Sequence, residues 1–343
     1  MERRFEGADG VRGLACLMVL CAHVPGFFIP EIAKYFSGTG KFGVWLFFVL
    51  SAFLLTNKFS RTGFSVSELA RYAIGRFLRI IPLFLLVVLI FWCFDSAEVL
   101  TAGDALKAAT FKRGYAHLWT IPVEFKFYFF LPFFAYLFIA SERKFGHFFT
   151  AVLAVVIIFA HQFVWPYWNA PENSISTHWY IPSFVLGCYA AVSIDSLRKY
   201  VTPVTATCVA VFVILSLLLL SPGGRNAMMG MPFDGWLQNK FIFLSFLWVI
   251  FIVFLADGKG VVGELMQTGF FRKMGAWSYS IYLIHWLFYQ KLSLVQNGWA
   301  YALFAVIGSI AAGALLYLFV ESPIEKFRHS LRRRINPKQP LAA

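Results

Sequence analysis

Long apolar runs recur along the whole chain and are separated by short polar segments. The clearest runs are at 151–160, 204–220, 241–255 and 301–320. A bilayer core of about 30 Å requires about 20 mostly apolar residues per helix, and several runs approach that length. The pattern predicts an all-α fold, a polytopic transmembrane helical bundle with about ten transmembrane helices. The predicted spans are 10–28, 39–57, 79–94, 118–140, 147–165, 179–194, 202–220, 239–256, 274–292 and 299–320.

The spans form one continuous domain. No Pro-, Gly- or Ser-rich linker, low-complexity segment or strong internal repeat interrupts them. We expect a transmembrane domain at 1–320 and a basic cytoplasmic tail at 321–343. The polar segments at 95–117 and 221–238 either cover an outer-facing site or merely connect helices.

Composition excludes a soluble globular domain. Of the 343 residues, 59% are hydrophobic and 14% are charged, whereas soluble domains carry about 25% charged residues. The five cysteines lie in apolar runs without metal-ligand spacing, so we expect packing roles and no metal site. The first apolar run lacks a small-residue cleavage site, and we expect it to be a span rather than a cleaved signal peptide.

The net charge of +13 has a topological explanation. Because the chain changes sides at each span, every second connecting segment lies on the same side as the N-terminus. Most Lys and Arg lie in these segments and in the tail. Positive charge accumulates on the cytoplasmic side of membrane proteins, so we expect both termini in the cytoplasm. The basic tail is then a segment near anionic membrane lipid, and we expect no nucleic-acid partner.

A few ionisable residues lie within the predicted spans. On insertion scales each costs about 2.5–3.5 kcal/mol at the centre of a span, so such residues are candidates for function. They are Arg12, His23, Glu124, Lys126, His161 and His285.

Arg12 and His23 share the first span. They are eleven residues apart, which is about three helical turns plus 20°, so they lie on one helix face. They are about 16 Å apart along the axis, with Arg12 at the cytoplasmic end. The pair suits a substrate with an anionic head and a reactive far end. The alternative is a snorkelling arginine and a packing histidine.

Glu124 is expected at a depth close to that of His23. A carboxylate beside an imidazole fixes its tautomer and raises its basicity, as base catalysis requires. The alternative is a structural ion pair with Lys126. Tyr128 follows one turn later, and Trp119 either belongs to an aromatic belt or contributes to the site with His117.

Two further positions have both a functional and a structural interpretation. Arg76 and Arg79 are adjacent on a helix face, where they either bind phosphate or act as topology determinants. His285 is either a second acid or base or an interhelical hydrogen-bond partner. We expect His161 to be structural.

Taken in order, several segments resemble the acyltransferase family 3 of integral membrane enzymes. The segments are DGVRGLACLMVLCAH with Asp9, Arg12 and His23; GVWLFFVLSAFLL with Gly43 and Ser51; GRFLRIIP with Arg76 and Arg79; HLWTIPVEFKFYF with His117, Trp119, Glu124 and Tyr128; MGAWSYSIYLIHW with Tyr282 and His285; and VESPIEK. The chain departs from the family pattern at Ala52, Thr120, Phe125 and Lys126.

The resemblance implies ten core helices, an essential His23 and arginines that engage acyl-CoA. It implies a multi-pass protein of the bacterial inner membrane that moves an acyl group, expected to be acetyl, from cytosolic acyl-CoA to a hydroxyl of a periplasm-facing carbohydrate or glycolipid. Acyl-CoA is then a co-substrate, and no metal or other cofactor is required. His23 acts as a general base or forms an acyl-histidine.

Two other functions remain open from the sequence. One is a transporter of organic acids or glycans, with Arg12 as anion site and His23 as proton relay. The other is a catalytically silent subunit of a glycan-assembly complex. The sequence does not determine the oligomeric state.

Overall fold

The computed structural model describes residue 5 and residues 7–335, and every regular element in that part of the chain is a helix. The long helices are α1 (Ala8–Phe28), α3 (Gly40–Thr62), α4 (Val66–Cys93), α6 (Thr120–Val164), α7 (Ile181–Leu197), α8 (Pro203–Leu220), α10 (Phe241–Leu255), α12 (Gly269–Ser293), α13 (Trp299–Leu316) and α14 (Ser322–Ile335). The short elements are α2 (Pro30–Phe36), α5 (Ala102–Ala109), η1 (Ala116–Trp119), η2 (Tyr167–Asn169), η3 (Thr177–Tyr180), η4 (Arg198–Tyr200), α9 (Pro222–Met229), η5 (Trp236–Asn239), α11 (Gly260–Met266) and η6 (Tyr317–Glu321).

The helices agree with the predicted all-α membrane bundle. Among the described residues, seven helices are long and apolar enough to cross a membrane, or eight when the bent pair α10 and α11 counts as one span. All ten predicted ranges fall on helical structure, with shifted boundaries. The number of spans and the side on which the termini lie stay predictions.

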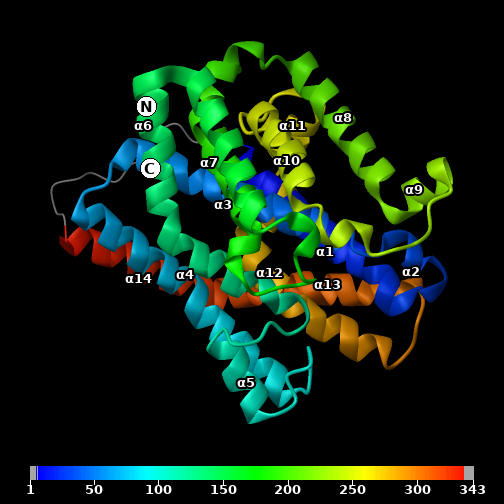
Figure 1. Cartoon of the computed structure of the whole chain (residues 1–343). Helices are drawn as coiled ribbons and strands as arrows, with labels where there is room; N and C mark the ends of the chain where they lie inside the picture. The colour runs from blue at the N-terminus through cyan, green and yellow to red at the C-terminus, as the bar shows by residue number, and fades with distance from the viewer. Residues whose placement is uncertain (1–4, 6, 336–343) are drawn as a thin grey trace.

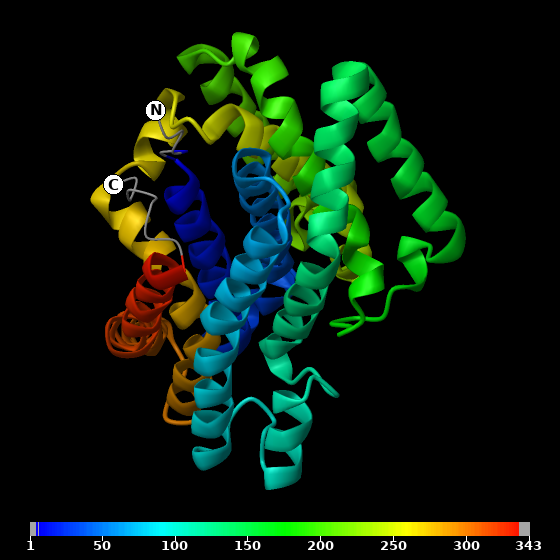
Figure 2. The same ribbon diagram turned by 90° about the vertical axis from the view of Figure 1, so that its left-hand side faces the viewer.

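Two of the predicted spans, 118–140 and 147–165, belong to the single element α6. At Gly146 the backbone has φ 78°, a conformation that glycine adopts without the steric cost of a side chain. The chain turns back there, and Figure 2 shows the two halves of α6 as a hairpin.

The predicted span at 79–94 begins too late. Helix α4 starts at Val66, where the side chain of Ser65 accepts a hydrogen bond from the backbone N–H of Glu68. Arg76 and Arg79 therefore lie inside a continuous helix, ten or more residues after its capped N-terminus, and share a helix face as predicted.

The centre of the bundle is formed by α1 packed between α3 and α12 (Figure 1). Close approach depends on glycine at both contacts. A Cβ atom on Gly275 of α12 would lie 1.8 Å from the backbone oxygen of Asp9, and one on Gly43 of α3 would lie 2.4 Å from that of Ala15. Small residues let membrane helices pack backbone to backbone. This close packing sets the distances between the polar side chains that α1, α3 and α12 contribute to the candidate site.

Large apolar side chains cover the outside of the long helices. On α6, Phe129 is 72% exposed and Phe163 is 87% exposed, and α8 and α13 carry similar residues. In water such a surface would aggregate, whereas in a bilayer it is solvated by lipid chains. The chain is a multi-pass membrane protein by this pattern of exposure and by the length of its apolar helices.

Candidate active site

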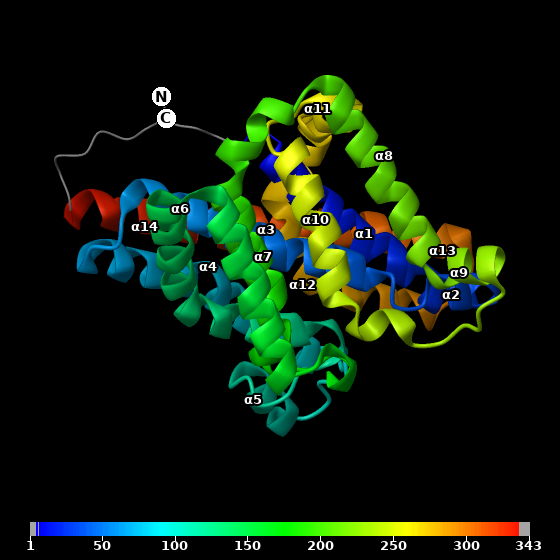
Figure 3. The same ribbon diagram turned by 45° about the horizontal axis from the view of Figure 1, so that its top comes forward.

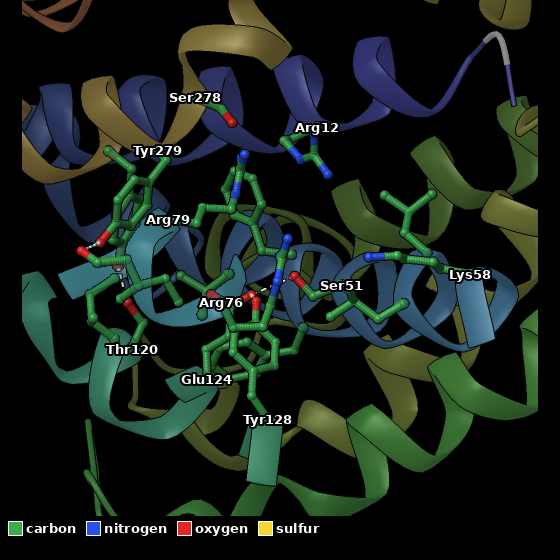
Figure 4. Close-up of a pocket in the computed structure, with 18 of the residues that line it drawn as sticks. Arg12, Ser51, Lys58, Arg76, Arg79, Thr120, Glu124, Tyr128, Ser278 and Tyr279 are labelled. Atoms are coloured by element: carbon green, nitrogen blue, oxygen red, sulfur yellow. Dashed lines mark hydrogen bonds between the residues drawn. The ribbon is translucent and has the colours of Figure 1, made fainter. Parts of the chain in front are cut away.

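The first of two pockets in the helical core is lined by many charged side chains. We call it the arginine pocket; its volume is about 290 Å³. Its charged lining consists of Arg12, Lys58, Arg76, Arg79, Arg328, Glu124 and Glu325. Figure 4 shows cationic side chains from α1, α3 and α4 pointing into one space. Five cations face two carboxylates there, so the pocket suits an anionic ligand.

The arginines of this pocket differ in their partners. Arg12 forms an ion pair with Asp9 at 3.3 Å, and Arg79 forms one with Glu321 at 3.6 Å. The guanidinium of Arg76 lies 5.7 Å from the ring centre of Tyr128 and has no ion-pair partner among the described residues. Arg76 is therefore the arginine best placed to pair with a bound phosphate.

Glu321 belongs to the C-terminal VESPIEK segment. Its side chain is 5% exposed, and its Oε2 atom accepts a hydrogen bond from the hydroxyl of Ser280 at 2.9 Å. The ion pair to Arg79 thus joins α4 to the end of the chain. Glu321 is the first residue of the predicted basic tail at 321–343. Within that tail Ser322–Ile335 form α14, whose residues Glu325 and Arg328 line the pocket.

Glu124 lies in the arginine pocket rather than beside His23. Its Oε1 atom accepts hydrogen bonds from the hydroxyls of Ser51 and of Tyr128, the latter at 2.5 Å. Lys126 points elsewhere and donates to the backbone oxygen of Ile175 at 3.4 Å. The sequence suggested that Glu124 pairs with His23 or, alternatively, with Lys126. Both pairings are wrong, because the carboxylate bonds to Ser51 and Tyr128 instead.

The second pocket, which we call the histidine pocket, contains His23. Its volume is about 610 Å³. The polar and aromatic lining residues are His23, Phe27, Lys34, Phe36, Ser37, Lys41, Glu98, His117, Trp119, Glu172, Asn173, Tyr282 and Trp286. Arg12 and His23 therefore line different pockets although they share one helix, whereas the sequence suggested that both face a single substrate.

His23 forms a hydrogen bond with His285 of α12. Its Nδ1 atom lies 3.2 Å from Nε2 of His285, and Nδ1 of His285 lies 2.6 Å from the backbone oxygen of Tyr282. Because a carbonyl only accepts, Nδ1 of His285 must carry a proton. In the neutral ring Nε2 then accepts the proton of His23 Nδ1. This network assigns His23 the tautomer with an unprotonated Nε2 atom, which is the form that a general base requires.

Gly40 keeps this nitrogen accessible. A Cβ atom at position 40 would lie 3.3 Å from Nε2 of His23, tighter than an ordinary van der Waals contact. Gly40 is the first residue of α3 and lines the histidine pocket. No pattern along the chain connects this glycine with His23, so its role is visible only in the tertiary structure.

His117 and Trp286 surround the two coupled histidines. The rings of His117 and His285 are 4.6 Å apart, and His117 stacks on Trp286 at 5.3 Å. Nε2 of His117 lies 3.0 Å from the backbone oxygen of Leu283, so this nitrogen donates. Its Nδ1 atom is buried without a hydrogen-bond partner in the described structure.

The two pockets meet at Val44 and Tyr282, which line both. The Tyr282 hydroxyl donates to the backbone oxygen of His117 at 2.8 Å and lies 2.9 Å from the hydroxyl of Thr120. Thr120, where the family pattern has serine, still supplies a hydroxyl. Tyr282 thus lies at the boundary between the cationic and the imidazole groups, with its hydroxyl held by two hydrogen-bond partners.

The remaining predicted residues are Trp119 and His161. Trp119 lines the histidine pocket and packs against Tyr180, with ring centres 5.4 Å apart. His161 lines neither pocket, and its Nε2 atom lies 2.7 Å from the backbone oxygen of His178. No group of three or more His, Cys, Asp or Glu in the described part of the chain is arranged to hold a metal ion.

Comparison with protein families gives one match. The sequence model of acyltransferase family 3, described as "Acyltransferase domain", matches residues 5–319. The match includes five of the long helices that line the two pockets, α1, α3, α4, α6 and α12. Helix α14, which contributes Glu325 and Arg328 to the arginine pocket, lies beyond the matched residues. No curated protein and no solved structure matches the chain.

Proposed function

Because the chain belongs to acyltransferase family 3, we propose that it transfers an acyl group from acyl-CoA to a hydroxyl of a carbohydrate, with His23 as general base. The observation that carries the proposal is the junction of the two pockets at Val44 and Tyr282. The cationic pocket on one side suits the acyl donor. The imidazole with an open Nε2 atom on the other side suits the acceptor, so the two substrates arrive from opposite directions.

The arginine pocket supports acyl-CoA as the donor. Coenzyme A carries several phosphate charges, and arginine binds phosphate through paired, charge-assisted hydrogen bonds. In this proposal the phosphates bind Arg76 with help from Arg12 and Lys58. The pantetheine arm then extends past Ser51 and Glu124, whose carboxylate accepts hydrogen bonds from amide N–H groups. The thioester reaches the wall formed by Val44 and Tyr282.

The proposed reaction requires one base that later acts as an acid. The acceptor hydroxyl oxygen attacks the thioester carbonyl carbon while Nε2 of His23 takes the hydroxyl proton. The C–S bond breaks as the ester forms, and the imidazolium returns the proton to the departing thiolate. His285 stabilises the imidazolium by accepting the proton of His23 Nδ1 in a hydrogen bond throughout.

The histidine pocket supports a carbohydrate acceptor. Sugar rings pack against indole faces, and Trp119 and Trp286 supply two of them. Hydroxyl groups bind charged and amide side chains, which Lys41, Glu172 and Asn173 supply. Lys41 is held ready by its ion pair with Glu172 at 3.0 Å.

We place the arginine pocket on the cytosolic side of a bacterial inner membrane and the histidine pocket on the periplasmic side. The basic residues around α4 and α14 agree with this orientation under the positive-inside rule. Acetyl is the proposed acyl group, since a short chain passes Tyr282 with the least displacement of its ring.

The test is acyl transfer in proteoliposomes. Radiolabelled acetyl-CoA is supplied on one face and oligosaccharides on the other, and ester-linked label on the sugar is measured. The proposal expects transfer by the wild-type protein and none by well-inserted His23→Ala. Movement of acid or sugar across the membrane without ester formation would instead establish the transporter alternative.

A further inference from the structure

A third cavity lies far from the two pockets, between α7, α8, α10 and the second half of α6. Its volume is about 810 Å³, at the upper end of the range of about 300–1,000 Å³ that is usual for ligand pockets. Figure 3 shows α7, α10 and α8 next to one another, with α9 at one end. The cavity uses none of the residues assigned above to acyl transfer.

The walls of this cavity are apolar and open toward lipid. Val155, Phe243 and Phe246 line it and are each more than half exposed. In a membrane these exposed faces contact hydrocarbon rather than water. A hydrocarbon chain can therefore enter the cavity directly from the bilayer without losing apolar contacts.

A buried cation stands at the α9 end of the cavity. Arg225 is 4% exposed, and its guanidinium lies 4.7 Å from the ring centre of Trp236, which also lines the cavity. One Nη atom pairs with Asp234 at 2.7 Å. The Nε atom is buried without a hydrogen-bond partner in the described structure. An unpaired buried donor of this kind is costly, so an acceptor that binds beside it is favoured.

The charges around Arg225 do not cancel. Lys240 lies 5.0 Å from the ring centre of Trp236 and donates to Asn239 at 2.8 Å. The hydrogen bond from Arg225 lowers the pKa of Asp234, which therefore stays ionised. Two cations and one carboxylate leave one positive charge beside the mouth of an apolar cavity, the complement of a lipid phosphate.

We propose that this cavity binds a membrane phospholipid, with an acyl chain between α8 and α10 and the phosphate against Arg225 and Lys240. A membrane phospholipid combines the two required features, a hydrocarbon chain and a phosphate with a single negative charge. The site shares no lining residue with the two pockets of the proposed acyl transfer.

The bound lipid would also support the histidine pocket. The ring of Phe233, in the segment after α9, lies 4.9 Å from that of Tyr35 and 5.1 Å from Nζ of Lys34. Lys34 belongs to α2 and lines the histidine pocket. A phosphate at Arg225 would hold the segment that packs against this wall.

Native mass spectrometry of the full-length protein tests the site. Phosphatidylglycerol is compared with diacylglycerol of the same chains, with glycerol phosphate and with polyprenyl phosphate. We expect phosphatidylglycerol to bind about tenfold or more tightly than diacylglycerol or glycerol phosphate, because the first lacks the phosphate and the second lacks the chains. We also expect it to bind more tightly than polyprenyl phosphate, because a phosphate monoester carries more than the single negative charge that the site balances. If diacylglycerol binds as tightly as phosphatidylglycerol, no phosphate is recognised. If polyprenyl phosphate binds more tightly than phosphatidylglycerol, the cavity belongs to a different lipid. Either result overturns the proposal.

Two kinds of variant locate the bound lipid. Ala151→Trp fills the cavity, whereas Val152→Trp, next to it on α6 and outside the lining, is the matched control. We expect the first to lower phosphatidylglycerol occupancy about tenfold relative to the second. Arg225→Gln and Lys240→Gln should each weaken binding, and Lys240→Gln serves if loss of Arg225 prevents folding. Unchanged occupancy in Ala151→Trp and Lys240→Gln would overturn the assignment.

Discussion

The Nδ1 atom of His23 and the Nε2 atom of His285 lie 3.2 Å apart, although the two residues are 262 positions apart in the chain. His285 in turn is held by the backbone oxygen of Tyr282. The position that a carboxylate occupies in many hydrolytic triads is thus taken by a second, neutral histidine. His285 is a positioning residue for His23 in the proposed reaction.

Replacing His285 should lower kcat without changing the KM for acyl-CoA. His285→Leu removes the acceptor for His23 Nδ1–H, so the ring can adopt the wrong tautomer, and we expect a loss of about 10²-fold in kcat. His285→Gln retains an oxygen acceptor and should recover part of the rate. Steady-state kinetics on both variants checks this. Equal rates for the Leu and Gln variants would show that His285 does not act through this hydrogen bond.

Adding one methyl group at Gly40 should block the proposed base. The new Cβ atom would lie 3.3 Å from Nε2 of His23, so Gly40→Ala should displace the ring or the acceptor and lower kcat on the order of 10²-fold. Gly26→Ala is the control, because Gly26 lines the same pocket but a Cβ there meets nothing within 4 Å. If both variants transfer acyl groups at the wild-type rate, Nε2 of His23 is not the reacting atom.

Arg76 and Arg79 should respond differently to substitution. Arg76→Ala should raise the KM for acyl-CoA by about tenfold or more, since a hydrogen bond to a charged group contributes about 1.5–3 kcal/mol. Arg71→Ala is the control for loss of positive charge on the same helix, because Arg71 pairs with Glu68 instead. An unchanged KM in Arg76→Ala would remove this arginine from the donor site.

Arg79→Ala should mainly reduce stability. It leaves the buried carboxylate of Glu321 without its cation, at a cost of about 1–3 kcal/mol. Thermal unfolding in detergent should therefore shift to lower temperature. The double variant Arg79→Ala with Glu321→Gln should regain much of the loss, since glutamine is neutral and still accepts from Ser280. No recovery in the double variant would mean that Arg79 has another role.

Replacing Glu124 should lower kcat/KM for acyl-CoA, and replacing Lys126 should not change that effect. Glu124→Gln weakens the acceptor for Ser51 and Tyr128, so kcat/KM for acyl-CoA should fall. Lys126→Gln in the same protein should restore nothing, because Lys126 binds the backbone of Ile175. Kinetics on the single and double variants decides this. Recovery in the double variant would show that the two side chains do form an ion pair in the membrane.

Relations within one helix could be predicted from the sequence. Hydrophobic runs located helical structure in all ten predicted ranges, and the period of 3.6 residues placed Arg12 and His23 at opposite ends of one face. Each of the motifs that carry the resemblance to the family contributes at least one residue to one of the two pockets. The C-terminal motif contributes Glu325 to the arginine pocket, and its Glu321 pairs with Arg79 there.

Relations between helices depended on tertiary packing. The sequence placed Glu124 at the depth of His23, yet the two side chains lie in different pockets, because rotation and axial offset between α1 and α6 leave no periodic trace along the chain. Helices α1 and α12 pack together, with Gly275 against the backbone of Asp9, and His23 meets His285 farther along the same pair of helices. Sequence alone determined which residues are expensive to place in a membrane and on which face of their own helix they lie. Only the packed structure determined which of them touch, because contact across helices is decided by the close fit of small residues at each interface.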